Sequence, residues 1–269
     1  MTSASPAPQA FMVLGMHKSG TTLLAETLHR SGIVMEDGPA ETGGYDHGQK
    51  MERARAQAIN KAYLACGDAP SHDITAPARP DPARHAACLA QAQAMIADLS
   101  QPGAPRWGFK DPRTLLCLPL WREAFDTTQI APRLIGIYRH PVEVFGHYKR
   151  LLGRKWLHRD PGYLLRVLHS WCAHNRALHD LAQTYPDMVL LEFTALMTEE
   201  AEMARLAQVI AAPLEDMRQA GMYRARGRDD RDYRIARAAL RLRGQPDPER
   251  LLQALDQLRA RQITRWQAA

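Results

Sequence analysis

A short apolar run followed by a glycine-bounded turn limits the N-terminal part of the chain to one kind of structure. Residues 11–14 (Phe-Met-Val-Leu) have the length and composition of a buried strand, and residues 15–22 read Gly-Met-His-Lys-Ser-Gly-Thr-Thr. Leu24 and Leu28 then keep a helical spacing over a predicted helix at 21–31. A strand, a tight turn and a helix in this order are the unit from which parallel α/β sheets are built.

The rest of the chain repeats this alternation of strands and helices. Further strands are predicted at 107–110, 133–138 and 188–192, and helices at 50–65, 83–99, 114–125, 142–152, 162–183 and 248–266. The pattern predicts an α/β fold of three layers, with a parallel central sheet flanked by helices. We expect one domain over 11–269 with a helical C-terminal part, preceded by a disordered leader at 1–10 that lacks the features of a signal peptide.

Composition excludes several classes of protein. Of the 269 residues 45% are apolar and 24% are charged, which is ordinary for a chain that buries a large core. No apolar run is long enough to cross a bilayer, so we expect no stable membrane insertion. The four cysteines form no Cys-x-x-Cys pair, which excludes a zinc knuckle and a disulfide framework and favours a reducing cytoplasm. The net charge of +6 favours anionic ligands.

The turn at 15–22 has the chemistry of an anion-binding loop. Gly15 and Gly20 stand at the spacing of the phosphate loop G-x-x-x-x-G-K-[ST], but Thr21 takes the place of the lysine, and the nearby lysine is Lys18. Successive backbone N–H groups in such a turn, backed by the positive end of a helix dipole, form a cradle for phosphate esters. Lys18 adds a mobile positive charge, and Thr21 and Thr22 add hydroxyl donors.

The ends of the other strands favour a phosphate ester that needs no metal ion. Hydrolysis of a nucleoside triphosphate requires Mg²⁺, which is usually held by a loop hydroxyl and by an acid at the end of a second strand. The strand at 133–138 is followed by Arg139 instead, and the strand at 188–192 ends in Glu192. The histidines show no paired ligand spacing with cysteines or carboxylates, so we expect no metal site.

Residues 18–22 (Lys-Ser-Gly-Thr-Thr) resemble the 5′-phosphosulfate loop of sulfotransferases that use 3′-phosphoadenosine 5′-phosphosulfate (PAPS), and residues 13–33 resemble the opening of many bacterial members. The resemblance implies a P-loop-like fold and PAPS as co-substrate without a metal. It also implies that Lys18 stabilises the charge on the leaving phosphate. The loop residues that it assigns to the donor are His17, Lys18, Ser19, Gly20, Thr21 and Thr22. His17 stands at a position that varies in this family.

A second motif of the family is also present. Arg139-His140-Pro141 resembles the family's R-[DH]-P segment, in which the arginine and a serine eight residues later hold the 3′-phosphate of PAPS. In this chain the serine position is occupied by His147, whose imidazole can also donate a hydrogen bond to phosphate. Arg226, followed by glycine, resembles the basic loop that closes over the donor late in the chain.

The resemblance leaves the catalytic base open. Segment 107–125 resembles a family segment with a lysine at a strand end, which makes Lys110 a second candidate to stabilise the transferring group. Family members use either a histidine or a glutamate to accept the proton of the acceptor hydroxyl. The candidates in this chain are Asp46, which occupies a position where relatives carry glutamate, His47, of a residue type that titrates near neutrality when unperturbed, and Asp111.

These observations predict transfer of a sulfonate group from PAPS to a hydroxyl of a carbohydrate, lipid or small metabolite. An atypical P-loop kinase and a catalytically degenerate nucleotide-binding protein are the alternatives. The arginines between 224 and 243 form either a donor-closing loop or a solvated face, since aspartates are interleaved with them. Few aromatic residues accompany them, so we expect no binding of nucleic acid. The acceptor and the oligomeric state stay open.

Overall fold

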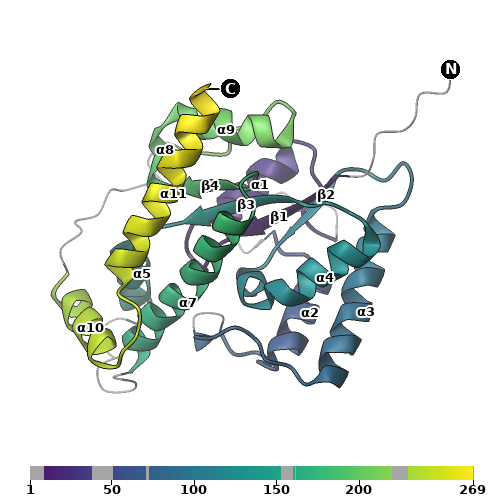
Figure 1. The fold of residues 1–269 in the computed structure, drawn as a ribbon. Helices are drawn as coiled ribbons and strands as arrows, with labels where there is room; N and C mark the ends of the chain where they lie inside the picture. Colours follow the sequence, from purple (N-terminus) through teal and green to yellow (C-terminus); the bar gives the residue numbers. More distant parts are fainter. Residues whose placement is uncertain are drawn as a thin grey trace.

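The computed structural model describes residues 9–37, 51–70, 73–152, 160, 162–219 and 230–268. Its centre is a sheet of four parallel strands in the order β2-β1-β3-β4 (Figure 1). The strands are β1 (Ala10–Leu14), β2 (Trp107–Lys110), β3 (Arg133–Tyr138) and β4 (Val189–Glu192). The predicted strands and their parallel arrangement are therefore confirmed, and β1 begins one residue earlier than expected. The predicted leader falls mostly on residues 1–8, which lie outside the described residues.

Helices cover both faces of the sheet (Figure 1). One face carries α1 (Thr21–Arg30), α8 (Phe193–Thr198) and α9 (Glu200–Ile210). The other face carries α2 (Ala54–Leu64), α3 (Pro82–Leu99), α4 (Leu118–Thr128), α5 (Pro141–Leu152), α7 (Tyr163–Thr184), α10 (Arg231–Leu242) and α11 (Pro248–Ala268). This is the expected three-layer α/β fold, with the P-loop-like order of strand, turn and helix at its start.

The segment after β2 departs from the expected single helix at 114–125. It forms a 3₁₀-helix, η2 (Pro112–Cys117), and then α4 from Leu118. Asp111 caps η2, and Pro119, which has no N–H to donate, lies in the first turn of α4. The prolines thus divide the segment into two helices.

The central position of β1 decides where the site lies. All five β1 residues are buried, and their side chains alternate between the two cores: Phe11 and Val13 on one face, Met12 and Leu14 on the other. Because β1 pairs in parallel with both β2 and β3, the chain leaves all three strands at the same edge. In open α/β sheets, ligands bind outside this carboxyl edge.

Two glycines allow the chain to turn sharply after β1. A Cβ on Gly15 would lie 2.5 Å from the carbonyl oxygen of Ile137, and one on Gly20 would lie 2.2 Å from Cδ2 of Phe193. Gly20 also has a φ of 95°, in the left-handed region that favours glycine. The turn is therefore built with no space for a side chain at either position.

We predict that Gly20→Ala destabilises the protein more than Gly32→Ala does. Both glycines have positive φ, but a Cβ on Gly32 would meet nothing within 4 Å. Gly32→Ala should cost about 1–2 kcal/mol of unfolding free energy for the left-handed conformation. Gly20→Ala should cost a further ~1–3 kcal/mol for overpacking against Phe193. Urea unfolding measures both values, and equal costs would contradict the close packing of the turn.

Candidate functional site

The turn after β1 contains a buried hydroxyl that has no hydrogen-bond partner among the described residues. The backbone N–H of Ser19 donates to the carbonyl oxygen of Met16 (3.2 Å), and that of Leu24 donates to the carbonyl oxygen of Gly20 (3.1 Å), where α1 begins. The Oγ of Ser19 is fully buried and has no hydrogen-bond partner in the described part of the chain. A buried hydroxyl without a partner costs free energy, so its presence in this turn indicates a place for a bound acceptor of hydrogen bonds.

Lys18 is the cation of the turn itself. It adopts a left-handed backbone conformation with a φ of 67° and is half-buried. Among the described residues no carboxylate forms an ion pair with it. Thr21 is buried and Thr22 half-buried at the start of α1. The turn therefore combines a positive charge that no described carboxylate pairs with and the N-terminus of a helix, and both attract anions.

Arg139 lies directly against this turn. Its Nη1 donates to the carbonyl oxygen of Lys18 (3.4 Å), and its Nε donates to Oε2 of the buried Glu143 (2.7 Å). Its guanidinium carbon lies 4.2 Å from the centre of the Phe193 ring, within the range of a cation–π interaction. The ring that packs on Gly20 thus also supports Arg139, so the two sequence motifs meet in one place.

His17 and His147 both contact Tyr148 of α5. The Nδ1 of His17 lies 2.6 Å from the Tyr148 hydroxyl, and the His147 ring meets the Tyr148 ring edge-on at 5.8 Å between centres. Burial raises the pKa of Tyr148 far above its ordinary value, so its hydroxyl stays protonated. Tyr148 therefore links the turn to the helix that follows Arg139.

Lys110 and Glu52 form a pair beside α1. The Nζ of Lys110, the last residue of β2, is buried and donates to Oε1 of Glu52 (3.0 Å) and to Oγ1 of Thr22 (3.5 Å). The second carboxylate oxygen of Glu52 accepts from Nε2 of Gln57 (2.7 Å). Glu52 is not among the site residues predicted from the sequence. The available signal was an acid at the start of the predicted helix 50–65, close to the glycine-rich segment that holds Asp46.

Of the three candidate bases predicted from the sequence, Asp111 lies in the part of the chain that the structure describes. Asp111 is almost fully buried and caps η2: Oδ1 accepts from the Arg113 N–H (2.7 Å) and Oδ2 from its Nη1 (2.9 Å). Burial raises the pKa of Asp111, with the Arg113 guanidinium opposing the shift. Asp46 and His47 lie outside the described residues, as does Arg226.

Glu192, at the end of β4, has a structural role. Its Oε2 accepts from the backbone N–H of Ala195 (2.8 Å) and so caps α8, and burial raises its pKa. Within the described ranges, no group of three His, Cys, Asp or Glu side chains is arranged to hold a metal ion. In the same ranges no helix has both the length and the apolar character needed to cross a membrane.

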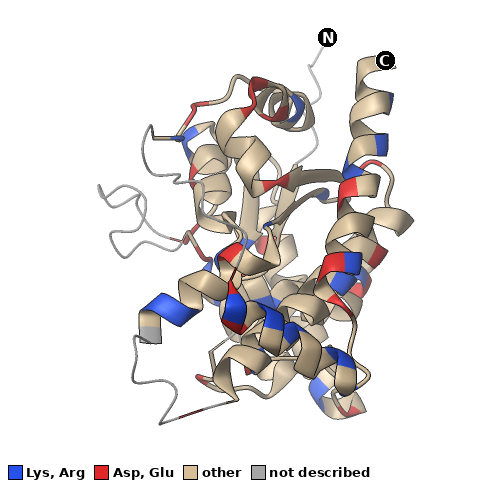
Figure 2. Ribbon diagram, turned by 90° about the vertical axis from the view of Figure 1, so that its left-hand side faces the viewer, with Lys and Arg blue, Asp and Glu red and all other residues tan. Residues whose placement is uncertain are grey.

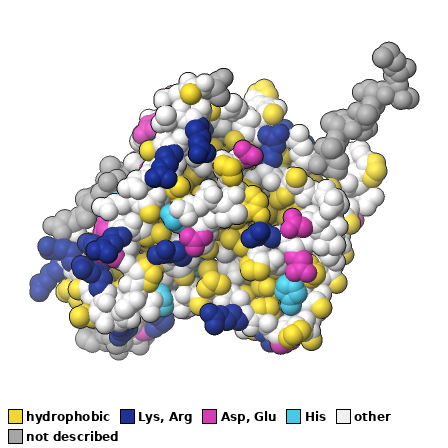
Figure 3. All heavy atoms as spheres, viewed as in Figure 1, with side chains coloured by type: hydrophobic (Ala, Val, Ile, Leu, Met, Phe, Trp, Pro, Cys, Tyr) yellow, Lys and Arg dark blue, Asp and Glu magenta, His cyan; other side chains and the backbone are white. Residues whose placement is uncertain are grey.

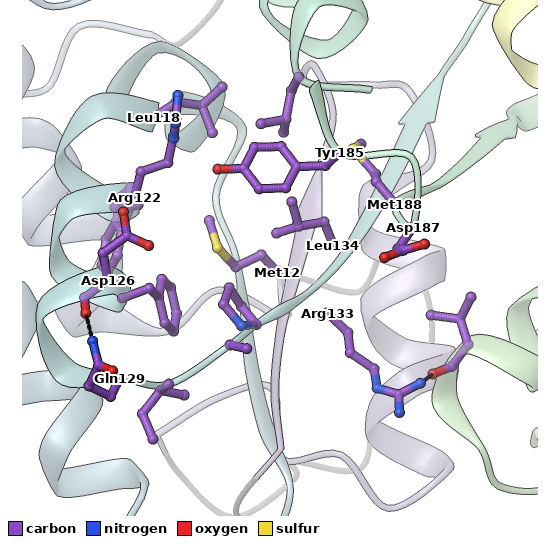
Figure 4. A pocket seen from close by; sticks show the side chains of 17 residues that line it. Met12, Leu118, Arg122, Asp126, Gln129, Arg133, Leu134, Tyr185, Asp187 and Met188 are labelled. Carbon is purple, nitrogen blue, oxygen red and sulfur yellow. Dashed lines mark hydrogen bonds between the residues drawn. The ribbon is translucent and has the colours of Figure 1, made fainter. Parts of the chain in front are cut away.

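A cavity of about 780 Å³ lies at the opposite edge of the sheet (Figure 4). Its lining includes Met12 and Leu134 from the sheet, Arg122 from α4 and Tyr185 after α7. The Arg122 guanidinium lies 5.6 Å from the centre of the Tyr185 ring. Of the site residues predicted from the sequence, those that the structure describes do not line this cavity.

Comparison with known proteins gives a family and a set of similar structures. Residues 9–216 match the family model described as "Sulfotransferase family". Similar solved structures are the sulfotransferase domain from the Synechococcus PCC 7002 olefin synthase (16% identity, TM-score 0.48, 97% of this chain and 96% of that chain covered) and the sulfotransferase domain from the curacin biosynthetic pathway (16%, 0.48, 84% and 82%). A third is sulfotransferase STF1 from Mycobacterium tuberculosis H37Rv (12%, 0.43, 79% and 70%). No curated protein matches the chain.

We predict opposite effects on stability for two buried serines. Ser19→Ala removes a buried hydroxyl that has no partner in the described ranges, so it should stabilise the ligand-free protein by up to about 1 kcal/mol. Ser170→Ala is the matched control, because the Ser170 hydroxyl donates to the Ile74 carbonyl oxygen (2.8 Å). That variant should lose about 1 kcal/mol. Denaturant unfolding without added anions measures both, and an equal loss for Ser19→Ala would show that its hydroxyl already has a partner.

Proposed function

The chain belongs to the sulfotransferase family, and we propose that it transfers a sulfonate group from PAPS to the hydroxyl of a carbohydrate, lipid or small-metabolite acceptor. The observation that carries the proposal is the buried Ser19 Oγ, which lies in a helix-capping turn beside Lys18 and Arg139 and forms no hydrogen bond with any described residue. A 5′-phosphosulfate supplies the acceptor oxygens that this hydroxyl and the backbone N–H groups of the turn require.

The residues present fit PAPS at both of its anionic ends. His17 to Thr22 would hold the 5′-phosphosulfate in the cradle of the turn. Arg139 would hold the 3′-phosphate, with His147 in the position of the family's serine. Glu143 and the Phe193 ring hold the Arg139 side chain in place, so little side-chain freedom is lost on binding. PAPS itself supplies the activated sulfonate.

The cations of the site have distinct tasks in this proposal. Sulfuryl transfer resembles phosphoryl transfer, in which charge builds up on the oxygen of the leaving group and catalysis rests on positioning and on fixed positive charges. Lys18, which has no carboxylate partner among the described residues, would neutralise that charge. Lys110 is fixed by Glu52 and Thr22 and would orient the hydroxyl of Thr22.

We propose Glu52 as the carboxylate that accepts the proton of the acceptor hydroxyl. Its Oε1 accepts a hydrogen bond from Lys110 Nζ, which also donates to Oγ1 of Thr22 at the end of the turn after β1. A general base must lie within hydrogen-bond reach of the reacting group, and Asp111 is held by its own cap contacts instead. Asp46 and His47 remain candidates for assisting Glu52.

We propose that the protein is a bacterial enzyme and that it is located in the cytoplasm. All four cysteines are free thiols, and Cys88, Cys117 and Cys172 are buried, which is the state expected in a reducing compartment. An atypical kinase would instead require ATP with Mg²⁺. A degenerate nucleotide-binding protein would bind adenosine 3′,5′-bisphosphate without transferring sulfonate. Turnover with radiolabelled PAPS and a panel of hydroxyl acceptors separates the three functions.

We expect adenosine 3′,5′-bisphosphate to raise the melting temperature more than AMP or ATP does. Binding at 100 times the dissociation constant stabilises the folded state by about 2.7 kcal/mol. Arg139→Gln should abolish the difference between the bisphosphate and AMP. Arg133→Gln, at the other end of β3, serves as the matched control and should preserve the difference. Equal shifts with AMP and the bisphosphate in the unmodified protein would rule out a 3′-phosphate site at Arg139.

Two substitutions should lower turnover while the fold persists. Loss of one group that stabilises transition-state charge typically lowers kcat about 10²–10³-fold, which we expect for Lys18→Ala. Loss of a general base lowers it about 10²–10⁴-fold, which we expect for Glu52→Gln. Lys61→Ala, which breaks a pair with the exposed Asp68, is the control and should keep the rate. An unchanged rate for either site variant would remove that residue from the mechanism.

A further inference from the structure

Helix α10 has apolar residues on two opposite faces. Its inner face buries Tyr233 and Leu240, and the Tyr233 ring meets Phe145 of α5 edge-on at 5.6 Å between centres. On the opposite side, Ile235 is 58% exposed and Leu242 is 90% exposed. A helix on the surface of a globular protein normally carries polar residues on the face turned away from the core. The outward apolar residues of α10 therefore need an explanation other than packing.

These outward residues follow helical spacing. Ile235, Ala238 and Leu242 stand at positions i, i+3 and i+7, so they form one stripe along two turns, and all three are exposed. Exposed large hydrophobic residues of the described ranges are Leu151, Ile235 and Leu242. Leu151 lies near the end of α5, whose Lys149 donates to Asp230 at the start of α10 (2.8 Å). The end of α5 therefore lies beside the first turn of α10.

Arginines accompany the apolar stripe. Arg231, Arg234 and Arg241 are exposed on α10, and Arg243 is exposed at its end. Figure 2 shows basic positions along this helix, and Figure 3 shows basic side chains gathered over it at the lower left. We call Arg231, Arg234, Ile235, Ala238, Arg241 and Leu242 the outer face of α10. It combines an apolar stripe with positive charge, which is the composition of helices that lie in a membrane interface.

We propose that the outer face of α10 binds the surface of an anionic membrane. Ile235 and Leu242 would enter the boundary between headgroups and acyl chains, while the long arginine side chains reach the lipid phosphates. Each basic residue near an anionic lipid surface strengthens binding about 5-fold. The proposal rests on α10 alone and does not depend on the reaction proposed above.

Two other occupants fit the outer face less well. A second copy of the chain, packed about a two-fold axis, would place the arginines of one α10 against those of the other. A protein groove recognises bulky anchors on successive helical turns. In this stripe the position between Ile235 and Leu242 is occupied by the small side chain of Ala238. A fluid lipid surface requires no such shape complementarity. Charge and spacing therefore both favour the membrane.

Sedimentation with lipid vesicles tests the proposal on the full chain. One set of vesicles contains phosphatidylglycerol and phosphatidylcholine in equal parts, and the other contains phosphatidylcholine alone. The unmodified protein should sediment with the anionic vesicles and stay in solution with the neutral ones. Arg231→Gln/Arg241→Gln should weaken binding about 25-fold, from 5-fold per arginine, and Leu242→Gln about 10-fold.

A matched control separates this face from net charge. Arg261→Gln/Arg265→Gln on α11 removes the same charge from exposed positions and should retain most of the binding. An equal loss in the α11 variant would overturn the proposal, because net charge alone would then explain the attraction. Absence of binding to the anionic vesicles would overturn it as well. So would a dimer in sedimentation velocity that Leu242→Gln dissociates, since a second copy would then occupy the face.

Discussion

The close approach of Gly20 to the Phe193 ring is the contact on which the rest of the site depends. The turn after β1 can pass between β3 and α8 only because neither Gly15 nor Gly20 carries a side chain. The same Phe193 ring supports the guanidinium of Arg139. One aromatic side chain therefore packs against both the turn after β1 and the arginine beside it. Burial of Ser19 in the turn follows from this tight packing. In a looser turn, water would satisfy the Ser19 hydroxyl, and a bound anion would then gain less free energy from it.

Around this contact, charges are balanced so that the site is ordered before a ligand arrives. Arg139 is paired with Glu143, and Lys110 with Glu52, each through a hydrogen bond of 3.0 Å or less. Fixed cations of this kind need no reorganisation when negative charge appears beside them. Lys18 differs, because no carboxylate among the described residues pairs with it. Arg139 and Lys110 are thus fixed by carboxylates, whereas Lys18 has no described carboxylate to fix it.

The sequence supported some parts of this picture and not others. The strands and the turn at 15–22 could be predicted because hydrophobic periodicity and glycine spacing are local properties, and the Arg139 motif was identified from its resemblance to a family segment. The contact between Arg139 and Phe193 could not, since it joins residues that are far apart in the chain. The ion pair between Glu52 and Lys110 could not be predicted for the same reason, because Lys110 reaches the acid from the end of β2, which is distant in the chain. The division of 112–128 into η2 and α4 was missed because the apolar spacing concealed the effect of two prolines.

We propose that the turn after β1 holds the 5′-phosphosulfate of PAPS, and a crystal structure with bound adenosine 3′,5′-bisphosphate is the decisive test. We expect the 5′-phosphate within hydrogen-bond distance of Ser19 Oγ and of the backbone N–H groups at Gly20 and Thr21, with the 3′-phosphate on Arg139. Bisphosphate bound elsewhere, such as in the cavity lined by Arg122 and Tyr185, with Ser19 Oγ still without a partner, would contradict it.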